Sequence, residues 1–322
     1  MKCLPKATLI YNPLAGTLNI HRSARAVARF WDEIGWDVQI EPTQYAGHGR
    51  ILAFKAAAEG SDLVLAAGGD GTLGEIAGGL AGTDTIMAPL PAGTGNSFTK
   101  ELMLANRGGL FRERTLLVAC EKLIHGKVQA IDLGCAQDNK YWLLWTSVGV
   151  DSYTVAHIEP RSKLARKFGS VGYLALGTPH LRKFPGMNAK VTIDERVIEG
   201  QFLMIVVSNC RRYAGGKFLL NPGAALDDGL FEVWLFKGRS GWSIYRYMMI
   251  MGRGRHLNHT DIQMETARDV SIETDPPIPY QRDGDPAGNA PVHCWLEQRA
   301  LHLLVPDTVS ESLFVQPGSP FP

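Results

Sequence analysis

The feature that most constrains the fold is the stretch at residues 63–71, which reads Leu-Val-Leu-Ala-Ala-Gly-Gly-Asp-Gly. Five apolar residues followed directly by glycines are typical of a buried strand that ends in a tight turn. Gly68, Gly69 and Gly71 allow positive φ angles and carry no Cβ, so backbone N–H groups can approach a ligand closely. The stretch therefore predicts a strand followed by a phosphate-binding turn.

A helix is predicted to begin within this turn. Thr72 and Glu75 have the spacing of a capping box, in which the two side chains satisfy free N–H groups at a helix start. The positive end of that helix would face the same ligand as the glycines. Asp70 is the only charged residue of the turn, and we expect it beside the phosphate and its cation. The alternative is that glycines and capping box form only a tight connection between strand and helix.

Length and charge narrow the class of protein. A chain of 322 residues exceeds one typical domain and allows two, each with its own core. Its 33 basic residues nearly balance its 32 acidic ones, so nucleic acid is not an expected partner.

Cysteine usage and hydropathy indicate the compartment. The five cysteines are scattered without a C-x-x-C pair, which is typical of reduced thiols in the cytoplasm. The opening apolar run is too short for a secretory signal, and no window approaches the roughly 20 apolar residues of a membrane span. We therefore expect a cytoplasmic protein that contacts a membrane only peripherally.

Strand-like and helix-like segments alternate over residues 1–128. Expected strands are 7–11, 36–40, 63–67 and 86–90; expected helices run through 24–34 and 49–59 and begin again at Phe98. Alternation of this kind predicts an α/β domain whose parallel sheet carries helices on both faces, with the loops after the strands gathered at one edge.

Residues 129–305 are instead a succession of runs rich in β-branched and aromatic residues, which predicts a mainly β second domain. The runs are 130–135, 141–148, 189–193, 197–208, 230–236, 270–274 and 300–305. The tail at 306–322 contains several prolines, and we expect it to pack on the first domain or to be disordered.

Two basic segments, 161–183 and 242–255, interrupt the strands. The first mixes cations with Leu, Phe and Tyr, and the second mixes them with Tyr and Met. Amphipathic basic helices can lie on anionic membrane surfaces. The alternative is a pair of ordinary helices that pack on a sheet and leave their cations in solvent.

Six motifs occur in a fixed order along the chain. They are Asn-Pro-Leu-Ala-Gly at 12–16, Gly-Gly-Asp-Gly-Thr at 68–72, Pro-Ala-Gly-Thr-Gly-Asn at 91–96, residues 164–173, Asn-Pro-Gly-Ala-Ala-Leu-Asp-Asp-Gly-Leu at 221–230 and Arg-Asp-Gly-Asp-Pro at 282–286. In this order they resemble the diacylglycerol kinase catalytic-domain family, which includes sphingosine and ceramide kinases and soluble bacterial lipid kinases.

The resemblance implies a fold and an activity. The fold is an N-terminal three-layer α/β domain like that of NAD kinases and phosphofructokinases, a C-terminal β-sandwich domain, and an active site between them. The activity is Mg²⁺-dependent transfer of phosphate from ATP to the hydroxyl of a diacylglycerol-like or sphingoid lipid. The residues implied at the nucleotide are Asn12, Gly16, Thr43, Gly68, Gly69, Asp70, Gly71, Thr72, Thr94, Gly95 and Asn96.

A general base is implied late in the chain, where the family has Asp-Gly-Glu and this chain has Asp283, Gly284 and Asp285. Asp285 would accept the proton of the lipid hydroxyl, a contribution of about 10²- to 10⁴-fold in rate. Its side chain is one methylene shorter than the glutamate of the family. Without the resemblance, these residues are typical of a hairpin turn.

A structural Mg²⁺ site is also implied. By resemblance to bacterial members, Asp228 would supply a carboxylate, and Ala225 and Leu230 would supply carbonyl oxygens, which are the hard ligands that Mg²⁺ prefers. An Asp-Gly turn without metal is the alternative.

Two further departures from the family lie near the glycine turns: Gly74 replaces a common asparagine, and Ser97 replaces a common aspartate. They leave open a weak or non-catalytic protein that binds nucleotide or lipid. An NAD kinase, which shares the Gly-Gly-Asp-Gly turn, is a second alternative, and the early Asn-Pro-x-x-Gly and late Asp-Gly-Asp motifs stand against it. His256, His259 and Asp261 lack further metal ligands at suitable spacing, so we expect them in a solvent-exposed loop. Neither the lipid nor the oligomeric state is specified by any motif.

Overall fold

The computed structural model describes residues 4–16, 20–105, 112–158, 179–181, 183–184 and 186–321. It divides into two compact units, one formed by Met1–Leu133 with Gln298–Pro322 and the other by Gly134–Glu297. The motif at 164–173 lies outside the described residues, as does most of the basic segment at 161–183.

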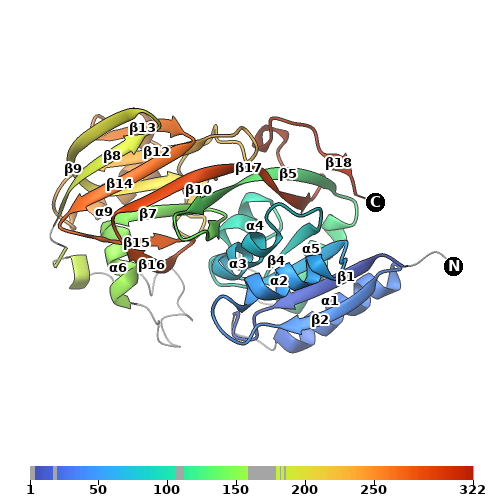
Figure 1. Ribbon diagram of the computed structural model, residues 1–322. Helices are drawn as coiled ribbons and strands as arrows, with labels where there is room; N and C mark the ends of the chain where they lie inside the picture. Colours follow the sequence, from blue (N-terminus) through green and yellow to red (C-terminus); the bar gives the residue numbers. More distant parts are fainter. Residues whose placement is uncertain are drawn as a thin grey trace. The chain divides into compact units, whose positions relative to one another are not determined.

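A parallel sheet forms the centre of the first unit (Figure 1). Its strands lie in the order β2, β1, β3, β4, and each neighbouring pair is parallel. The end of β17 continues the sheet beside β4, with Leu303 opposite Met87. The strands are β1 (Lys6–Tyr11), β2 (Asp37–Pro42), β3 (Leu63–Gly68), β4 (Ile86–Pro91) and β17 (Val292–Val305). The predicted parallel sheet is confirmed.

Helices follow these strands and cover the sheet. Helix α1 packs on α5, and α2 packs on α3. Because each crossover between parallel strands is right-handed, α1 lies on one face and α2 and α3 on the other. The helices are α1 (Ile20–Glu33), α2 (His48–Ala58), α3 (Asp70–Leu80), α4 (Ser97–Glu101) and α5 (Arg112–Leu123). All six residues of β3 are buried, as its apolar run predicts for a central strand.

The tail does not form a separate body. Residues 298–322 belong to the first unit, and its last strand, β18 (Ser319–Pro320), pairs with the start of β5 (Lys127–Ala136). Phe321 stacks on Trp36 with ring centroids 5.6 Å apart. An aromatic anchor and a short strand therefore hold the tail against the first unit.

The second unit is mainly β, as predicted, and its strands pair antiparallel. Strand β9 pairs with β7, β8 and β12 and is the centre of the sheet. The order then continues from β8 through β14 to β17, and from β7 through β15 to β16. These strands are β7 (Trp145–Gly149), β8 (Met187–Ile193), β9 (Arg196–Ser208), β12 (Phe231–Lys237), β14 (Asp269–Asp275), β15 (Pro279–Arg282) and β16 (Asp285–Asn289).

Smaller elements complete this unit. They are β6 (Tyr141–Trp142), α6 (Val150–Ile158), β10 (Arg212–Tyr213), β11 (Phe218–Leu219), α9 (Ser243–Gly252), the 3-10 helix η1 (His256–Asn258) and β13 (Ile262–Ala267). The run predicted as one strand at 141–148 is interrupted between β6 and β7. The predicted exposed loop at His256 is wrong, because that side chain is buried and its Nε2 lies 2.7 Å from the carbonyl oxygen of Leu220.

Within the described part of the chain, no helix combines the length and the apolar character needed to cross a membrane.

Candidate functional site

The glycine turns of the first unit contact one another at the carboxyl ends of the strands. The amide nitrogen Nδ2 of Asn12, after β1, donates to Thr72 Oγ1 at 3.2 Å. The N–H groups of Ala92 and Gly93, after β4, both donate to the carbonyl of Gly68 at 3.1 and 3.0 Å. The structure therefore brings together the three turns that the sequence singled out.

Close packing, and not positive φ, explains the glycines at the centre of this cluster. Gly68, Gly69 and Gly71 could adopt positive φ, but none of them does. A Cβ at Gly93 would lie 2.4 Å from the Cα of Gly69, and one at Gly68 would lie 2.4 Å from the Cβ of Thr72. Two backbones pass each other here at a distance that only glycine permits.

Asp70 joins two of the turns. Its carboxylate oxygens accept the N–H of Ser97 at 2.9 Å and of Phe98 at 3.1 Å. These N–H groups begin α4 and have no partner within that helix, so Asp70 caps a helix that begins 27 residues later. Burial raises the pKa of Asp70, and the two N–H donors oppose the rise. Ser97, where the family often has aspartate, is itself fully buried.

The predicted capping box is wrong. Helix α3 begins at Asp70 behind the N-cap Gly69, with no side-chain cap, so Thr72 already lies inside its first turn. The Glu75 carboxylate instead accepts the N–H of Gly47 at 2.7 Å and of Gly49 at 3.0 Å, at the start of α2. The acids of α3 thus fix the starts of two neighbouring helices, a role that local spacing could not reveal.

The other nucleotide candidates lie around this cluster. Thr43 follows β2, and its N–H donates to Tyr11 at the end of β1. Asn96 is left-handed, with φ of 54°, and its Nδ2 donates to the carbonyl of Gly93. Gly16, Thr94 and Gly95 are at least partly exposed. The first N–H groups of α3 have no partner within the helix, so the cluster can accept an anion.

In the second unit, Asp283 and Gly284 form the turn of the β15–β16 hairpin. Their φ angles are 47° and 91°, and positive values at both positions are typical of a two-residue hairpin turn. The buried Asp283 carboxylate accepts the N–H groups of Leu143, Leu144 and Trp145 at 2.8, 2.7 and 3.2 Å. These contacts explain the interruption between β6 and β7. Asp285 opens β16 with an exposed side chain.

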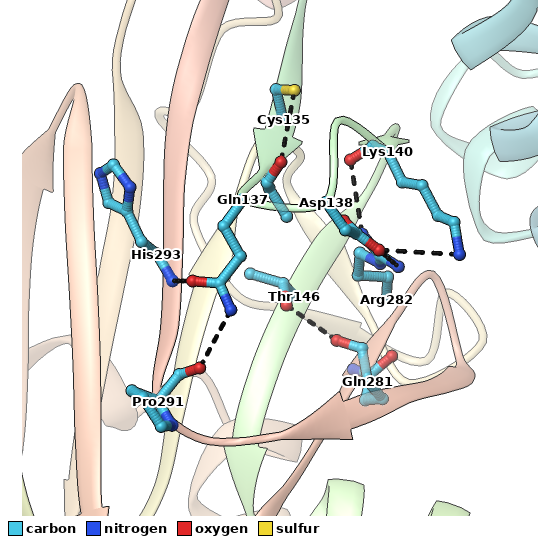
Figure 2. A network of polar contacts seen from close by, with 10 residues as sticks. Cys135, Gln137, Asp138, Lys140, Thr146, Gln281, Arg282, Pro291 and His293 are labelled. Carbon is cyan, nitrogen blue, oxygen red and sulfur yellow. Dashed lines mark hydrogen bonds and ion pairs between the residues drawn. The ribbon is translucent and has the colours of Figure 1, made fainter.

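Arg282 and Gln281 make further contacts that hold this hairpin in place (Figure 2). The Arg282 guanidinium binds the Asp138 carboxylate through two nitrogens at 2.5 and 2.9 Å. The carbonyl oxygen of Gln281 accepts the hydroxyl of Thr146 at 2.8 Å. Burial alone would raise the pKa of Asp138, but the bonds and charge of Arg282 hold it below its usual value. Bidentate pairing of this kind fixes geometry as well as charge.

The proposed metal ligands lie in one turn of the second unit. Asp228 Oδ1 accepts the N–H of Leu230 at 3.0 Å, and burial raises its pKa. Glu232, which sequence reasoning missed, is buried beside it. Burial and the Asp228 charge raise the pKa of Glu232 to about 8, and its Oε2 has no hydrogen-bond partner among the described residues. Two close carboxylates with an orphaned oxygen are suited to a hard cation.

The histidine pair considered as a metal site does not form one. Arg246 donates to His259 at 3.2 Å and to Asp261 at 3.1 Å. The guanidinium cation therefore already occupies the place between His259 and Asp261. Among the residues that the structure describes, no group of three or more His, Cys, Asp or Glu side chains is placed to hold a metal ion.

Comparisons with known proteins identify both units. Residues 6–136 match the model of the diacylglycerol kinase catalytic domain, and residues 145–305 match that of the YegS C-terminal NAD kinase beta sandwich-like domain. The predicted combination of an α/β domain and a β-sandwich is therefore confirmed.

Relatives extend the similarity over the whole chain. Diacylglycerol kinase of Bacillus subtilis is 27% identical over 96% of this chain and 99% of its own, and that of Staphylococcus carnosus is 26% identical over 97% and 98%. A crystal structure of a diacylglycerol kinase from Bacillus anthracis has the same fold, with a TM-score of 0.69 at 22% identity over 96% of this chain and 100% of its own. The chain belongs to the diacylglycerol kinase catalytic-domain family of lipid kinases.

Proposed function

We propose that this protein transfers the γ-phosphoryl group of ATP to the hydroxyl of a diacylglycerol-like or sphingoid lipid, with Asp285 as the general base. The observation that carries the proposal is the meeting of three glycine turns at the start of α3, held together by Asp70 and Asn12. An enzyme catalyses phosphoryl transfer mainly by positioning the phosphates and stabilising their developing negative charge. A cluster of backbone N–H groups is suited to both tasks.

In the proposed step, the lipid oxygen forms a bond to the γ-phosphorus while the bond from that phosphorus to the bridging oxygen breaks, and ADP leaves with the bridging oxygen. The lipid hydroxyl proton passes to the Asp285 carboxylate. An exposed carboxylate on a rigid hairpin is suited to this task, because it can reach a bound hydroxyl without losing its orientation.

The Asp228 turn is proposed to hold Mg²⁺, with the carbonyl oxygens of Ala225 and Leu230. The orphaned Glu232 oxygen beside Asp228 supports this assignment. When bound there, Mg²⁺ would offset the repulsion between the part-buried Asp228 and the buried Glu232 and would order the turn.

We also propose that α9 contacts the membrane. Trp242 and Met249 are 48% and 57% exposed and lie seven residues apart, on one face of the helix. Arg246 and Arg253 lie on the same face and are exposed too. Apolar anchors among arginines fit an anionic bilayer surface.

Vesicle flotation tests this contact. The protein should float with phosphatidylglycerol vesicles and not with phosphatidylcholine vesicles, and Trp242→Ser with Met249→Ser should abolish flotation. Equal flotation of the double variant would refute the contact. A dimer that the same changes dissociate would instead identify this face as a subunit interface.

The reaction itself is tested by the acceptor. Wild-type protein is incubated with [γ-³²P]ATP, Mg²⁺ and micelles of diacylglycerol, sphingosine or monoacylglycerol, with NAD in a parallel reaction. Label in the lipid fraction is the expected result. Label in NADP and none in lipid would replace the proposal with an NAD kinase. ATP binding without any labelled product would favour a non-catalytic role, to which Ser97 and Gly74 point.

A further inference from the structure

We propose that Gln281 is a positioning residue for Asp285, and that Ser147, Asp151 and Tyr213 set the orientation in which its side chain can act. The inference rests on the proposed role of Asp285. No family motif quoted above includes Gln281, Ser147, Asp151 or Tyr213.

The first observation is a contact on the Asp283–Gly284 peptide, one residue before the proposed base. The N–H of Gly284 donates to Gln281 Oε1 at 2.7 Å. Gly284 has φ of 91° and open space around its missing Cβ, so neighbouring side chains do not restrain it sterically. The Gln281 amide therefore directly restrains the Asp283–Gly284 peptide plane, one residue before Asp285.

The second observation is a chain of donors that fixes which way this amide faces. Gln281 Nε2 donates to Ser147 Oγ at 2.6 Å, and Ser147 donates to Asp151 Oδ2 at 2.5 Å. Tyr213 donates to the same Asp151 oxygen at 2.6 Å. A carboxylate only accepts, so Ser147 must give its single proton to Asp151 and accept from Gln281. The NH₂ end of the amide then faces Ser147, and its oxygen faces Gly284.

Burial makes this polar arrangement costly to disturb. Gln281 is 2% exposed, Ser147 is fully buried and Tyr213 is 7% exposed. A flipped Gln281 amide would place an NH₂ group against the Gly284 N–H and leave two donors unsatisfied, at roughly 1–3 kcal/mol each. The orientation that supports the base is therefore the one that the surrounding residues select.

Loss of this restraint is expected to affect turnover more than folding. The hairpin keeps the three bonds to Asp283 and the Arg282–Asp138 pair when Gln281 is changed. The Asp285 carboxylate would still be present but would sample more orientations, and misplacement by about 1 Å can cost on the order of 10² in rate.

A double-mutant cycle tests the inference. Gln281→Leu should lower kcat 10- to 100-fold, leave KM for ATP within twofold, and have less than a twofold further effect in an Asp285→Ala background, since a positioning residue has nothing left to position there. Gln129→Leu is the matched control, because Gln129 is also a buried glutamine with an amide-to-carbonyl bond. Its effect should be equal in both backgrounds.

The outcomes separate the inference from the proposed function. If Asp285→Ala keeps wild-type activity, the base assignment fails. If Asp285→Ala is impaired and Gln281→Leu is not, or if Gln281→Leu costs the same factor in both backgrounds, the positioning role alone fails.

A readout independent of activity completes the test. Exchange of the Gly284 amide proton, followed by NMR, should be at least tenfold faster in Gln281→Leu and measurably faster in Ser147→Ala than in wild type. Unchanged exchange in both variants would overturn the inference even if turnover fell.

Discussion

Asp70 illustrates how one residue can look catalytic in the sequence and show a second role in the structure. Its position among glycines suggested a group beside a phosphate and its cation. The structure shows both oxygens accepting N–H groups of α4. The two roles are compatible, because each carboxylate oxygen has further lone pairs.

Replacement of Asp70 by Asn separates these roles. Asn keeps one of the two oxygen acceptors, and the loss of the other lowers the unfolding free energy by roughly 1–3 kcal/mol. The change also removes a negative charge whose burial is unfavourable. The melting temperature should fall by a few degrees, and kcat should fall at least 100-fold. Glu75→Gln is the control, since Glu75 also accepts two backbone N–H groups. A similar loss of kcat in both variants would assign Asp70 a structural role alone.

The Arg282–Asp138 pair predicts a pH dependence of stability. The pKa of Asp138 is held low in the folded protein, so the pair stabilises the fold above the unfolded pKa of about 3.9. That contribution is lost as pH falls through the folded value. Asp138→Asn should lower the unfolding free energy by about 1–2 kcal/mol at pH 7, the modest figure reflecting a side chain that is 34% exposed.

Urea titrations at several pH values measure this difference. The unfolding free energies of wild type and Asp138→Asn should differ by a constant amount between pH 5 and 8 and converge as the pH falls through the lowered pKa of Asp138 in the folded protein. A difference that persists undiminished in acid would contradict the role of the charge.

At the scale of elements, α3 organises its neighbours. Asp70 at its start fixes α4, Glu75 one turn later fixes α2, and Gly69 before it meets Gly93. The turns that follow three different strands are therefore tied to one helix. A nucleotide bound there would contact a cluster whose parts cannot move independently.

Alanine substitutions at the glycine crossing test this tie. In Gly93→Ala the new Cβ would lie 2.4 Å from Gly69 Cα, so the turns must separate; in Gly69→Ala the nearest contact is 3.4 Å. Gly93→Ala should lose ATP affinity more than tenfold and melt at a lower temperature, whereas Gly69→Ala should melt like wild type. Calorimetric ATP titration and thermal unfolding measure both. Equal behaviour of the two variants would contradict the close-packing explanation.

The Asp228 turn makes a prediction about metal. Addition of millimolar Mg²⁺ to chelator-treated protein should raise the melting temperature by several degrees, because ligand binding to the folded state stabilises it. Asp228→Asn should remove most of that rise. An equal rise in wild type and variant would place Mg²⁺ elsewhere.

Elements with strong apolar patterns were predictable from the sequence, and elements held by distant polar contacts were not. Strands β1 to β4 of the first unit coincide with the predictions within two residues, because an apolar run before a glycine turn is a local signal. Strands β15 and β16 were missed, because they are short and polar and are held by Asp283 and Arg282 through partners about 140 residues away in sequence.

The same distinction explains the outcome for the candidate site. The glycine turns could be found from their spacing, as could the Asp-Gly-Asp turn. Other features depend on contacts between distant segments, which spacing does not encode. They are the helix caps formed by Asp70 and Glu75, the hydrogen bonds from Gln281 through Ser147 to Asp151, and the unpartnered oxygen of Glu232.

For the whole molecule, the two units carry different parts of the proposed chemistry. The first unit supplies backbone N–H groups and glycines for phosphates, and the second supplies the carboxylate for proton acceptance, the proposed metal turn and the α9 face. An NAD kinase would share the Gly-Gly-Asp-Gly turn, so the residues of the second unit distinguish the two activities.

The most direct test of the central claim is single-turnover transfer from [γ-³²P]ATP to lipid by wild type, Asp285→Ala and Asp285→Glu. We predict labelled lipid with wild type, a rate about 10²- to 10⁴-fold lower with Asp285→Ala, and substantial activity with Asp285→Glu, which restores the family residue. Labelling of lipid at equal rates by wild type and Asp285→Ala, or no labelling of any lipid by wild type, would contradict the account.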